Sequence, residues 1–244
     1  MTKDAQFLID ACKSAAELIT DEFVVNSKNE NGDLVTNFDL EVENFLIERL
    51  RGEYPNFEIV SEEYNPDVNG GENYFTIDPI DGTVNFAHGL PLWAITVAMV
   101  RDGKLVACVI YAPKLNELYY ADESGAYLND KKISVNKLPL EKAVFCLKDS
   151  YKDRLIQKAL LTEKAIFLKE RKIVCAALLS AWVAAGRVGI AMFGTKIWDY
   201  LPGKFLVEQA GGAACILGKK FENDDKSMLY MVANSKELLE EIKG

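Results

Sequence analysis

The apolar residues of this chain change their spacing twice, and that change limits the folds open to it. Ala5 to Phe23 and Phe38 to Arg51 carry apolar side chains at helical spacing. Between Trp93 and Val135, short runs of β-forming residues are separated by turn residues, as in a meander of strands. Strand-like and helical runs then alternate. We therefore predict helices on a largely antiparallel sheet over residues 1–137 and an α/β unit over residues 138–244.

Shorter runs complete the predicted order of elements. Two apolar runs before the meander are expected to be strands, at Phe57–Val60 and Tyr74–Ile77. In the second half, the strand-like runs are Val144–Leu147, Ala165–Leu168, Val188–Phe193, Ala213–Leu217 and Met228–Ala233. The helical runs are Tyr151–Leu161, Ile173–Gly186, Tyr200–Ala210 and Ser235–Ile242. This alternation is typical of a sheet covered by helices.

Charge and composition argue against several classes of partner. Asp and Glu number 37 against 28 Lys and Arg, so the formal net charge is −9. Such a chain is repelled by nucleic-acid phosphates and gains little from an anionic membrane. The five cysteines are scattered and no pair is spaced as C-x-x-C, so we expect buried, reduced thiols. We expect a cytoplasmic protein that binds neither nucleic acid nor a membrane.

The segment with the most chemical information begins at Asp78, where an apolar run ends. Residues 78–81 read Asp-Pro-Ile-Asp, which suits a tight turn whose ends lie within about 7 Å. Carboxylates that close repel each other unless a cation lies between them. Gly82 allows close approach of the backbone, and Thr83 is expected to begin a helix whose free N–H groups face an anion. The pattern predicts that a dication and a phosphate meet here; an ordinary surface turn with solvated aspartates is the alternative.

Two further acidic elements favour the first interpretation. The segment Ser61-Glu62-Glu63 follows the apolar pair Ile59–Val60, at the expected end of a strand. Asp199 stands between a tryptophan and a helical run, where its alternative role is to cap the N-terminus of that helix. Asp39 has the same ambiguity, because Asp is common at the third position of a capping box, here one starting at Thr36.

Together these segments resemble the inositol monophosphatase family. Residues 77–86, reading IDPIDGTVNF, are similar to the signature of that family. The other similar motifs are DLVTNFD at 33–39, Ser61-Glu62-Glu63, Trp198-Asp199 followed by Gly203, and EQAGG at 208–212. The motifs occur in the family's order and at its spacing, and they cover nearly the whole chain.

The resemblance implies a fold, a cofactor and an assembly. The implied fold is a layered αβαβα sandwich of the sugar-phosphatase type, with mixed and antiparallel sheets, helices between them, and a site between two subdomains. The implied cofactor is Mg²⁺, as two or three ions, which prefers oxygen ligands. The implied ligands are Glu63, Asp78, Asp81, Asp199 and the carbonyl of Ile80. Family members are commonly homodimers, and many are inhibited by lithium.

The resemblance also implies roles in the hydrolysis of a phosphomonoester. Glu63 and Asp78 would hold the ion that lowers the pKa of the attacking water, which makes Glu63 a catalytic residue as well as a ligand. Thr83, helped by Asp39, would orient and deprotonate that water. The backbone N–H groups of Gly82 and Thr83 would hold the phosphate.

The substrate side departs from the family's pattern. In relatives that act on inositol phosphate, an acidic residue shortly before Trp-Asp contacts sugar hydroxyls, whereas residues 189–193, reading GIAMF, contain no acid. Val174 and Cys175 stand where Gly and Ser or Thr are usual. We expect Met192 and Phe193 to line the leaving-group pocket. The alternative is that both are core residues of a strand.

Two functions of different classes remain open. The first is Mg²⁺-dependent hydrolysis of a small phosphorylated metabolite. Inositol monophosphate is the default substrate, and fructose 1,6-bisphosphate, histidinol phosphate and 3′-phosphoadenosine nucleotides are alternatives. The second is a non-catalytic regulatory protein on the same fold, which the complete set of acids disfavours. Lys28 is expected to be a solvated loop lysine, and His88, the single histidine, to be structural.

Overall fold

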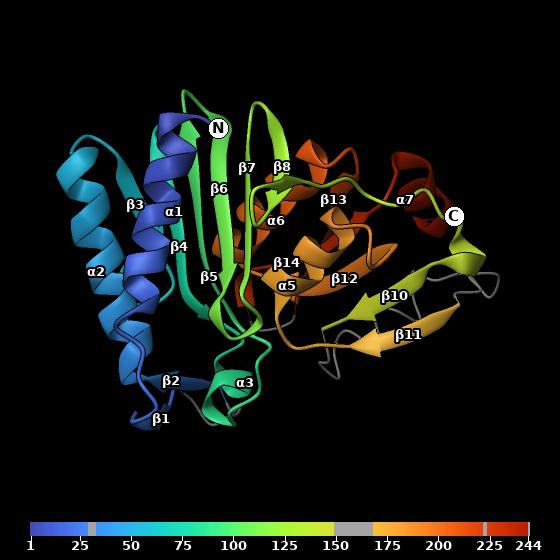
Figure 1. Cartoon of the computed structure of the whole chain (residues 1–244). Coiled ribbons are helices and arrows are strands. Elements are labelled where there is room, and N and C mark those ends of the chain that lie inside the picture. Colours follow the sequence, from blue (N-terminus) through green and yellow to red (C-terminus); the bar gives the residue numbers. More distant parts are fainter. Residues whose placement is uncertain (29–32, 149–167, 222–223, 244) are drawn as a thin grey trace.

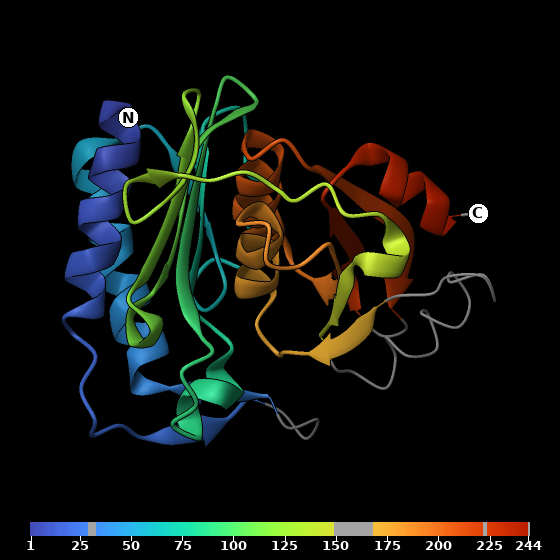
Figure 2. The same cartoon turned by 45° about the vertical axis from the view of Figure 1, so that its right-hand side comes forward.

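Five layers make up the computed structural model, which describes residues 1–28, 33–148, 168–221 and 224–243. Helices, a sheet, helices, a second sheet and a helix follow one another across the molecule (Figure 1). Figure 2, turned by 45°, shows the middle helices lying between the two sheets. The expected αβαβα sandwich is confirmed.

Two helices cover the outer face of the first sheet: α1 (Lys3–Ala16) and α2 (Asn37–Glu53). The start of α2 agrees with the prediction to within one residue. The apolar spacing predicted that α1 continues to Phe23, but the helix ends at Ala16. From there the backbone closes tighter turns, as in the bond from the N–H of Ile19 to the carbonyl of Ala16 at 3.2 Å.

Seven strands form the first sheet, in the order β3-β4-β5-β6-β7-β8-β9. β3 and β4 are parallel, and every other neighbouring pair is antiparallel. The predicted meander is therefore confirmed. The strands are β3 (Glu58–Ser61), β4 (Tyr74–Asp81), β5 (Ala94–Arg101), β6 (Lys104–Ala112), β7 (Glu117–Asp122), β8 (Gly125–Leu128) and β9 (Lys131–Lys132).

The middle layer consists of α5 (Ala176–Ala184) and α6 (Ile197–Gln209), which are apolar on nearly all sides. Such a sequence is typical of a buried helix. The two helices approach closely at Gly203, where an added Cβ would come within 2.5 Å of the Ser180 hydroxyl oxygen. One buried cluster contains side chains from both helices and both sheets, so the two halves of the chain share a core.

The second sheet has five strands in the order β11-β10-β12-β14-β13. β10 pairs in parallel with β11 and β12, whereas β14 is antiparallel to β12 and β13. The strands are β10 (Val144–Leu147), β11 (Lys169–Lys172), β12 (Ile190–Thr195), β13 (Ala213–Phe221) and β14 (Asp224–Ala233), and α7 (Lys236–Lys243) covers the outer face. The helix predicted at Tyr151–Leu161 lies outside the described residues, as does most of the strand predicted at Ala165–Leu168.

Short elements connect the layers. They are the hairpin of β1 (Val25–Ser27) and β2 (Leu34–Thr36), the helix α3 (Thr83–Ala87), and the 3₁₀ turns at Pro113–Leu115 and Leu140–Lys142. The chain passes from the first sheet to the second between β9 and β10, the stretch that holds the predicted boundary at 137/138. Among the described residues, no helix is both long and apolar enough to cross a membrane.

Candidate metal centre

A bulge near the end of β4 brings two aspartates together. Asp78 pairs with Thr96 and Asp81 pairs with Ala94, so β4 has one residue more than β5 over this stretch. In a regular strand, side chains three positions apart point to opposite faces of the sheet. The extra residue of a bulge allows them to point to the same face. The predicted separate turn is therefore wrong, since the strand itself continues to Asp81. The N–H of Ile80 donates to Asp78 Oδ1 at 2.9 Å.

The third carboxylate comes from α6. This helix begins at Ile197, before the predicted start at Tyr200, so Asp199 lies in its first turn and does not cap it. The hydroxyl of Thr195 donates to Asp199 Oδ2. Asp199 Oδ1 is buried and accepts no hydrogen bond from the part of the chain that the structure describes. Burying a carboxylate oxygen without a hydrogen-bond donor lowers the stability of the fold unless the oxygen binds a cation.

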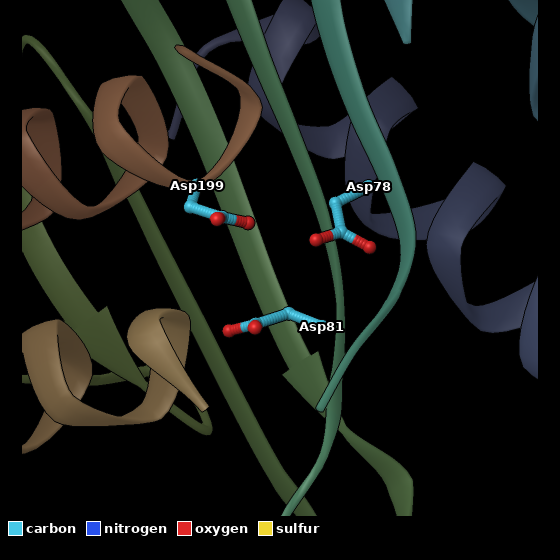
Figure 3. A group of neighbouring side chains, drawn as sticks. All are labelled: Asp78, Asp81 and Asp199. Carbon is cyan, nitrogen blue, oxygen red and sulfur yellow. The ribbon is translucent and has the colours of Figure 1, made fainter. Parts of the chain in front are cut away.

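The three carboxylates face one another in Figure 3, and their ligand oxygens lie within 4.8 Å of one another. All three side chains are buried. Burial, followed by the charges of Glu62 and Asp199, raises the pKa of Asp78 well above its usual value. Burial and the charge of Asp199 raise the pKa of Asp81 to about 6. The carboxylate oxygens are close together, and one of them accepts no hydrogen bond from the described residues. This arrangement fits a hard divalent cation such as Mg²⁺.

The fourth acid at this centre is Glu62, where the sequence predicted Glu63. Glu62 lines the cavity of about 330 Å³ that also holds the three aspartates, whereas Glu63 is absent from the described wall of that cavity. The carboxylate of Glu63 pairs instead with Lys28, and burial raises its pKa to about 7. Lys28 also pairs with Glu62, at 3.0 Å. It is an exposed residue after β1, as expected, but it also lines the cavity.

Asp39 and Thr83 form a hydrogen-bonded pair at the edge of the cavity. The hydroxyl of Thr83 lies 3.2 Å from Asp39 Oδ1 and 3.0 Å from the carbonyl oxygen of Ile80. The other oxygen of Asp39 accepts from the N–H and the hydroxyl of Thr36, at 2.7 and 2.5 Å. Burial raises the pKa of Asp39. Asp39 therefore completes the capping box of α2 and also contacts Thr83. Its capping role does not exclude a role in the site.

The backbone conformation and the close neighbours of position 82 require a glycine there. Its φ of +92° lies in the left-handed region, and an added Cβ would come within 2.9 Å of the carbonyl oxygen of Leu92 and 3.2 Å of that of Val174. The side-chain amide of Asn85 donates to the same two carbonyls, at 2.7 and 3.0 Å. These contacts fix Gly82 and Thr83 in the cavity wall, next to the segment that leads into α5.

Met192 and Phe193 lie in the core and not in the described cavity wall. Their exposed fractions are 1% and 0%, because β12 is an inner strand of its sheet and is covered on both faces. The alternative interpretation, that both are core residues of a strand, agrees with the structure. Downstream residues of the same segment, Gly194, Thr195 and Lys196, line the cavity instead.

His88 lies outside this arrangement. It is exposed, and its Nδ1 lies 2.8 Å from the carbonyl oxygen of Val84, where it holds the end of α3. The expected structural role agrees with these contacts.

Comparison with known proteins identifies the family. Residues 1–243 match the model of the inositol monophosphatase family. The chain belongs to this family. It is 34% identical over 235 residues to a fructose-1,6-bisphosphatase/inositol-1-monophosphatase of Thermotoga maritima, covering 90% of this chain and 89% of that protein. A putative Nus factor SuhB of Neisseria meningitidis serogroup A is 34% identical over 215 residues, covering 85% of this chain and 80% of that protein.

A solved structure supports the same assignment. The chain resembles an IMPase of Thermotoga maritima with a TM-score of 0.83 and 30% identity, over 98% of this chain and 94% of the other. Membership of the inositol monophosphatase family identifies the chain as an enzyme of the phosphatase type.

Glu62 and Lys148 are among the cavity residues of this inositol monophosphatase family member that sequence reasoning missed. Glu62 was passed over for its neighbour, and Lys148 carried no signal of its own. Lys148 follows β10 directly and lines the cavity with the three aspartates. Only the pairing of β10 with β12 shows that the end of this strand reaches the metal centre.

Proposed function

We propose that this chain hydrolyses small phosphomonoesters in a Mg²⁺-dependent reaction, with inositol monophosphate as the default substrate. The observation that carries the proposal is the buried Oδ1 of Asp199, beside Asp78 and Asp81, which accepts no hydrogen bond from any described residue. Membership of the family supports the reaction class. The names of the relatives support phosphorylated polyols and sugars as substrates.

The proposed ligands of two or three ions are Asp78, Asp81, Asp199, Glu62 and the carbonyl of Ile80. When bound, Mg²⁺ lowers the pKa of a water and offsets charge on the phosphoryl group and on the leaving oxygen. Glu62 replaces Glu63 in this set because its side chain lines the cavity. Glu63 is assigned a supporting role through its ion pair with Lys28.

Thr83 and Asp39 are proposed to handle the attacking water. The Thr83 hydroxyl has acceptors in Asp39 Oδ1 and the Ile80 carbonyl, so its own lone pairs are free to accept from a water. A carboxylate whose pKa is raised by burial is better suited to receive a proton, as Asp39 would through Thr83. Water attacks directly in this scheme, so no side chain forms a covalent intermediate.

The phosphate is proposed to lie against the backbone at Gly82 and Thr83. Both residues line the cavity, and an N–H group that faces a phosphoryl oxygen stabilises the charge that it carries. Cytoplasmic location, assembly as a homodimer and inhibition by lithium are further parts of the proposal, which rest on the family alone.

Release of phosphate from a panel of substrates tests the proposal. The panel contains inositol 1-phosphate, fructose 1,6-bisphosphate, histidinol phosphate and 3′-phosphoadenosine 5′-phosphate, each assayed with Mg²⁺ and with excess chelator. We expect turnover of at least one substrate with Mg²⁺ and none with chelator. A regulatory protein is the second candidate, since one relative is named as a putative Nus factor. Absence of Mg²⁺-dependent turnover across the panel would favour that candidate.

A further inference from the structure

Lys148 directly follows β10, in the second sheet. Its backbone N–H donates to the carbonyl of Met192 in β12 at 3.3 Å, so strand pairing fixes where it lies. It lines the cavity together with Gly194 and Thr195 from the second sheet. Gly82 and Thr83 line the same cavity from the end of β4, in the first sheet.

The charges that act on the ammonium of Lys148 come from the metal centre. Burial alone would lower the pKa of Lys148, but Asp199, Asp81 and Asp78 outweigh burial and raise it. Lys28, which also lines the cavity, is already engaged by Glu62 and Glu63. Lys148 is therefore a charged group that lines the same cavity as the three aspartates.

Binding of divalent cations changes which groups compensate the positive charge of Lys148. In the proposed function, on which this inference rests, two or three Mg²⁺ ions bind. Two ions already bring four positive charges, against the four negative charges of Asp78, Asp81, Asp199 and Glu62. The acids are then matched by the ions and no longer compensate Lys148. A partly buried ammonium without a counter-charge is costly, so an anion that enters the cavity beside it gains affinity.

We propose that Lys148 is a specificity-determining residue that selects phosphomonoesters whose alcohol part carries a second anionic group, either a phosphate or a carboxylate. The transferred phosphoryl group lies at Gly82 and Thr83, so the alcohol part extends toward the second sheet. Lys148 and Thr195 line the cavity from the second sheet. A charge-assisted hydrogen bond between the ammonium and the second anion then favours such substrates over neutral ones.

Matched pairs of substrates test the inference. 2-Phosphoglycerate and glycerol 2-phosphate differ only by a carboxylate in place of a hydroxymethyl group. Glucose 1,6-bisphosphate and glucose 1-phosphate differ by a second phosphate. For the wild type in Mg²⁺, we expect kcat/KM to be roughly tenfold to a hundredfold higher for the anionic member of at least one pair. The pair that shows the preference identifies the second anion.

The ratio within a pair is the quantity to compare among variants, because effects on folding or on metal binding cancel from it. Lys148→Met is expected to lower the ratio about tenfold or more, and Lys148→Arg to keep most of it. Lys142→Met, an exposed lysine before the same strand, is the matched control and should keep the wild-type ratio. Equal losses for both members of every pair, or an unchanged ratio in Lys148→Met, would overturn the inference.

Equilibrium binding gives a second readout that needs no turnover. Calorimetry in Mg²⁺ compares 3-phosphonopropionate with 3-hydroxypropylphosphonate, which cannot be hydrolysed. We expect tighter binding of the carboxylate by the wild type and loss of that preference in Lys148→Met. If the wild type shows no preference, the inference fails even when hydrolysis is observed. If neither neutral nor anionic phosphomonoesters are hydrolysed, the proposed function fails, and the phosphonate pair still decides the role of Lys148.

Discussion

Glu43 accepts a hydrogen bond from the backbone N–H of Glu63 at 2.8 Å. Its second oxygen accepts from the N–H of Tyr64 at 2.7 Å, and the side chain is fully buried in α2. One carboxylate of a rigid helix thus fixes the loop that follows β3. The loop presents the carboxylate of Glu62 to the cavity, so Glu43 supports the metal centre from behind without contacting it.

Glu43→Gln should therefore weaken the response to Mg²⁺. Glutamine replaces one acceptor oxygen by an amino group, which cannot accept from a backbone N–H. Loss of support behind a metal ligand typically costs about 10–100-fold in metal affinity. We expect the Mg²⁺ concentration for half-maximal activity to rise by about tenfold or more. Glu48→Gln, on the exposed face of the same helix, is the control. An unchanged Mg²⁺ requirement in a folded Glu43→Gln protein would show that the loop after β3 keeps its position without the Glu43 carboxylate.

The two consecutive glutamates make a matched pair of variants. Since Glu62 lines the cavity and Glu63 pairs with Lys28, Glu62→Gln should lower kcat at saturating substrate far more than Glu63→Gln. Titration of activity against Mg²⁺ should show the larger shift for Glu62→Gln. The reverse order of effects would restore Glu63 as the ligand and reject our assignment.

The sequence predicted the aspartates of the centre because they stand in short segments with a local chemical meaning. Asp78 and Asp81 are three residues apart, and no tertiary information is needed to expect them together. Even so, the sequence indicated a turn, and the structure reaches the same result with a bulge in β4. Asp199 was identified through its neighbour Trp198, although the start of α6 was placed too late.

The remaining errors depend on tertiary contacts that no local pattern encodes. Glu62 and Glu63 are chemically identical, and which of them faces the cavity depends on Glu43, which lies far away in the sequence. Met192 and Phe193 resemble pocket residues until the packing of β12 is known: Phe193 packs in a cluster with α5 and α6, and Met192 in a cluster with α7. Lys148 gains its position from strand pairing alone.

Asp4 provides a pH test of stability away from the metal centre. Burial opposes ionisation, but Arg101 contacts both carboxylate oxygens, at 2.7 and 3.1 Å, and the hydroxyl of Tyr54 donates at 2.7 Å. The pKa of Asp4 is therefore held below its usual value. A carboxyl that is more acidic when folded stabilises the protein above its unfolded pKa, and this contribution is lost as pH falls through the folded value.

Asp4→Asn is expected to lower the free energy of unfolding by about 1 kcal/mol at pH 7, since the pair is partly exposed. The difference from the wild type should shrink as the pH falls below about 4. Urea unfolding across this range measures it. Asp10→Asn, exposed on the same helix, serves as the control and should change stability little. A difference that stays constant with pH would mean that the ion pair contributes nothing.

The kcat of Asp81→Asn across a range of Mg²⁺ concentrations tests the central claim most directly. Asp81 Oδ2 accepts from the N–H of Ala177 at 2.6 Å, a bond that the oxygen of asparagine can keep, so the fold should survive. Removing one anionic ligand should lower kcat by roughly a thousandfold or more, and added Mg²⁺ should not restore it. Circular dichroism and a thermal melt verify that the variant is folded. Turnover like that of the wild type at moderate Mg²⁺ would contradict the assignment of this cluster as the catalytic metal centre.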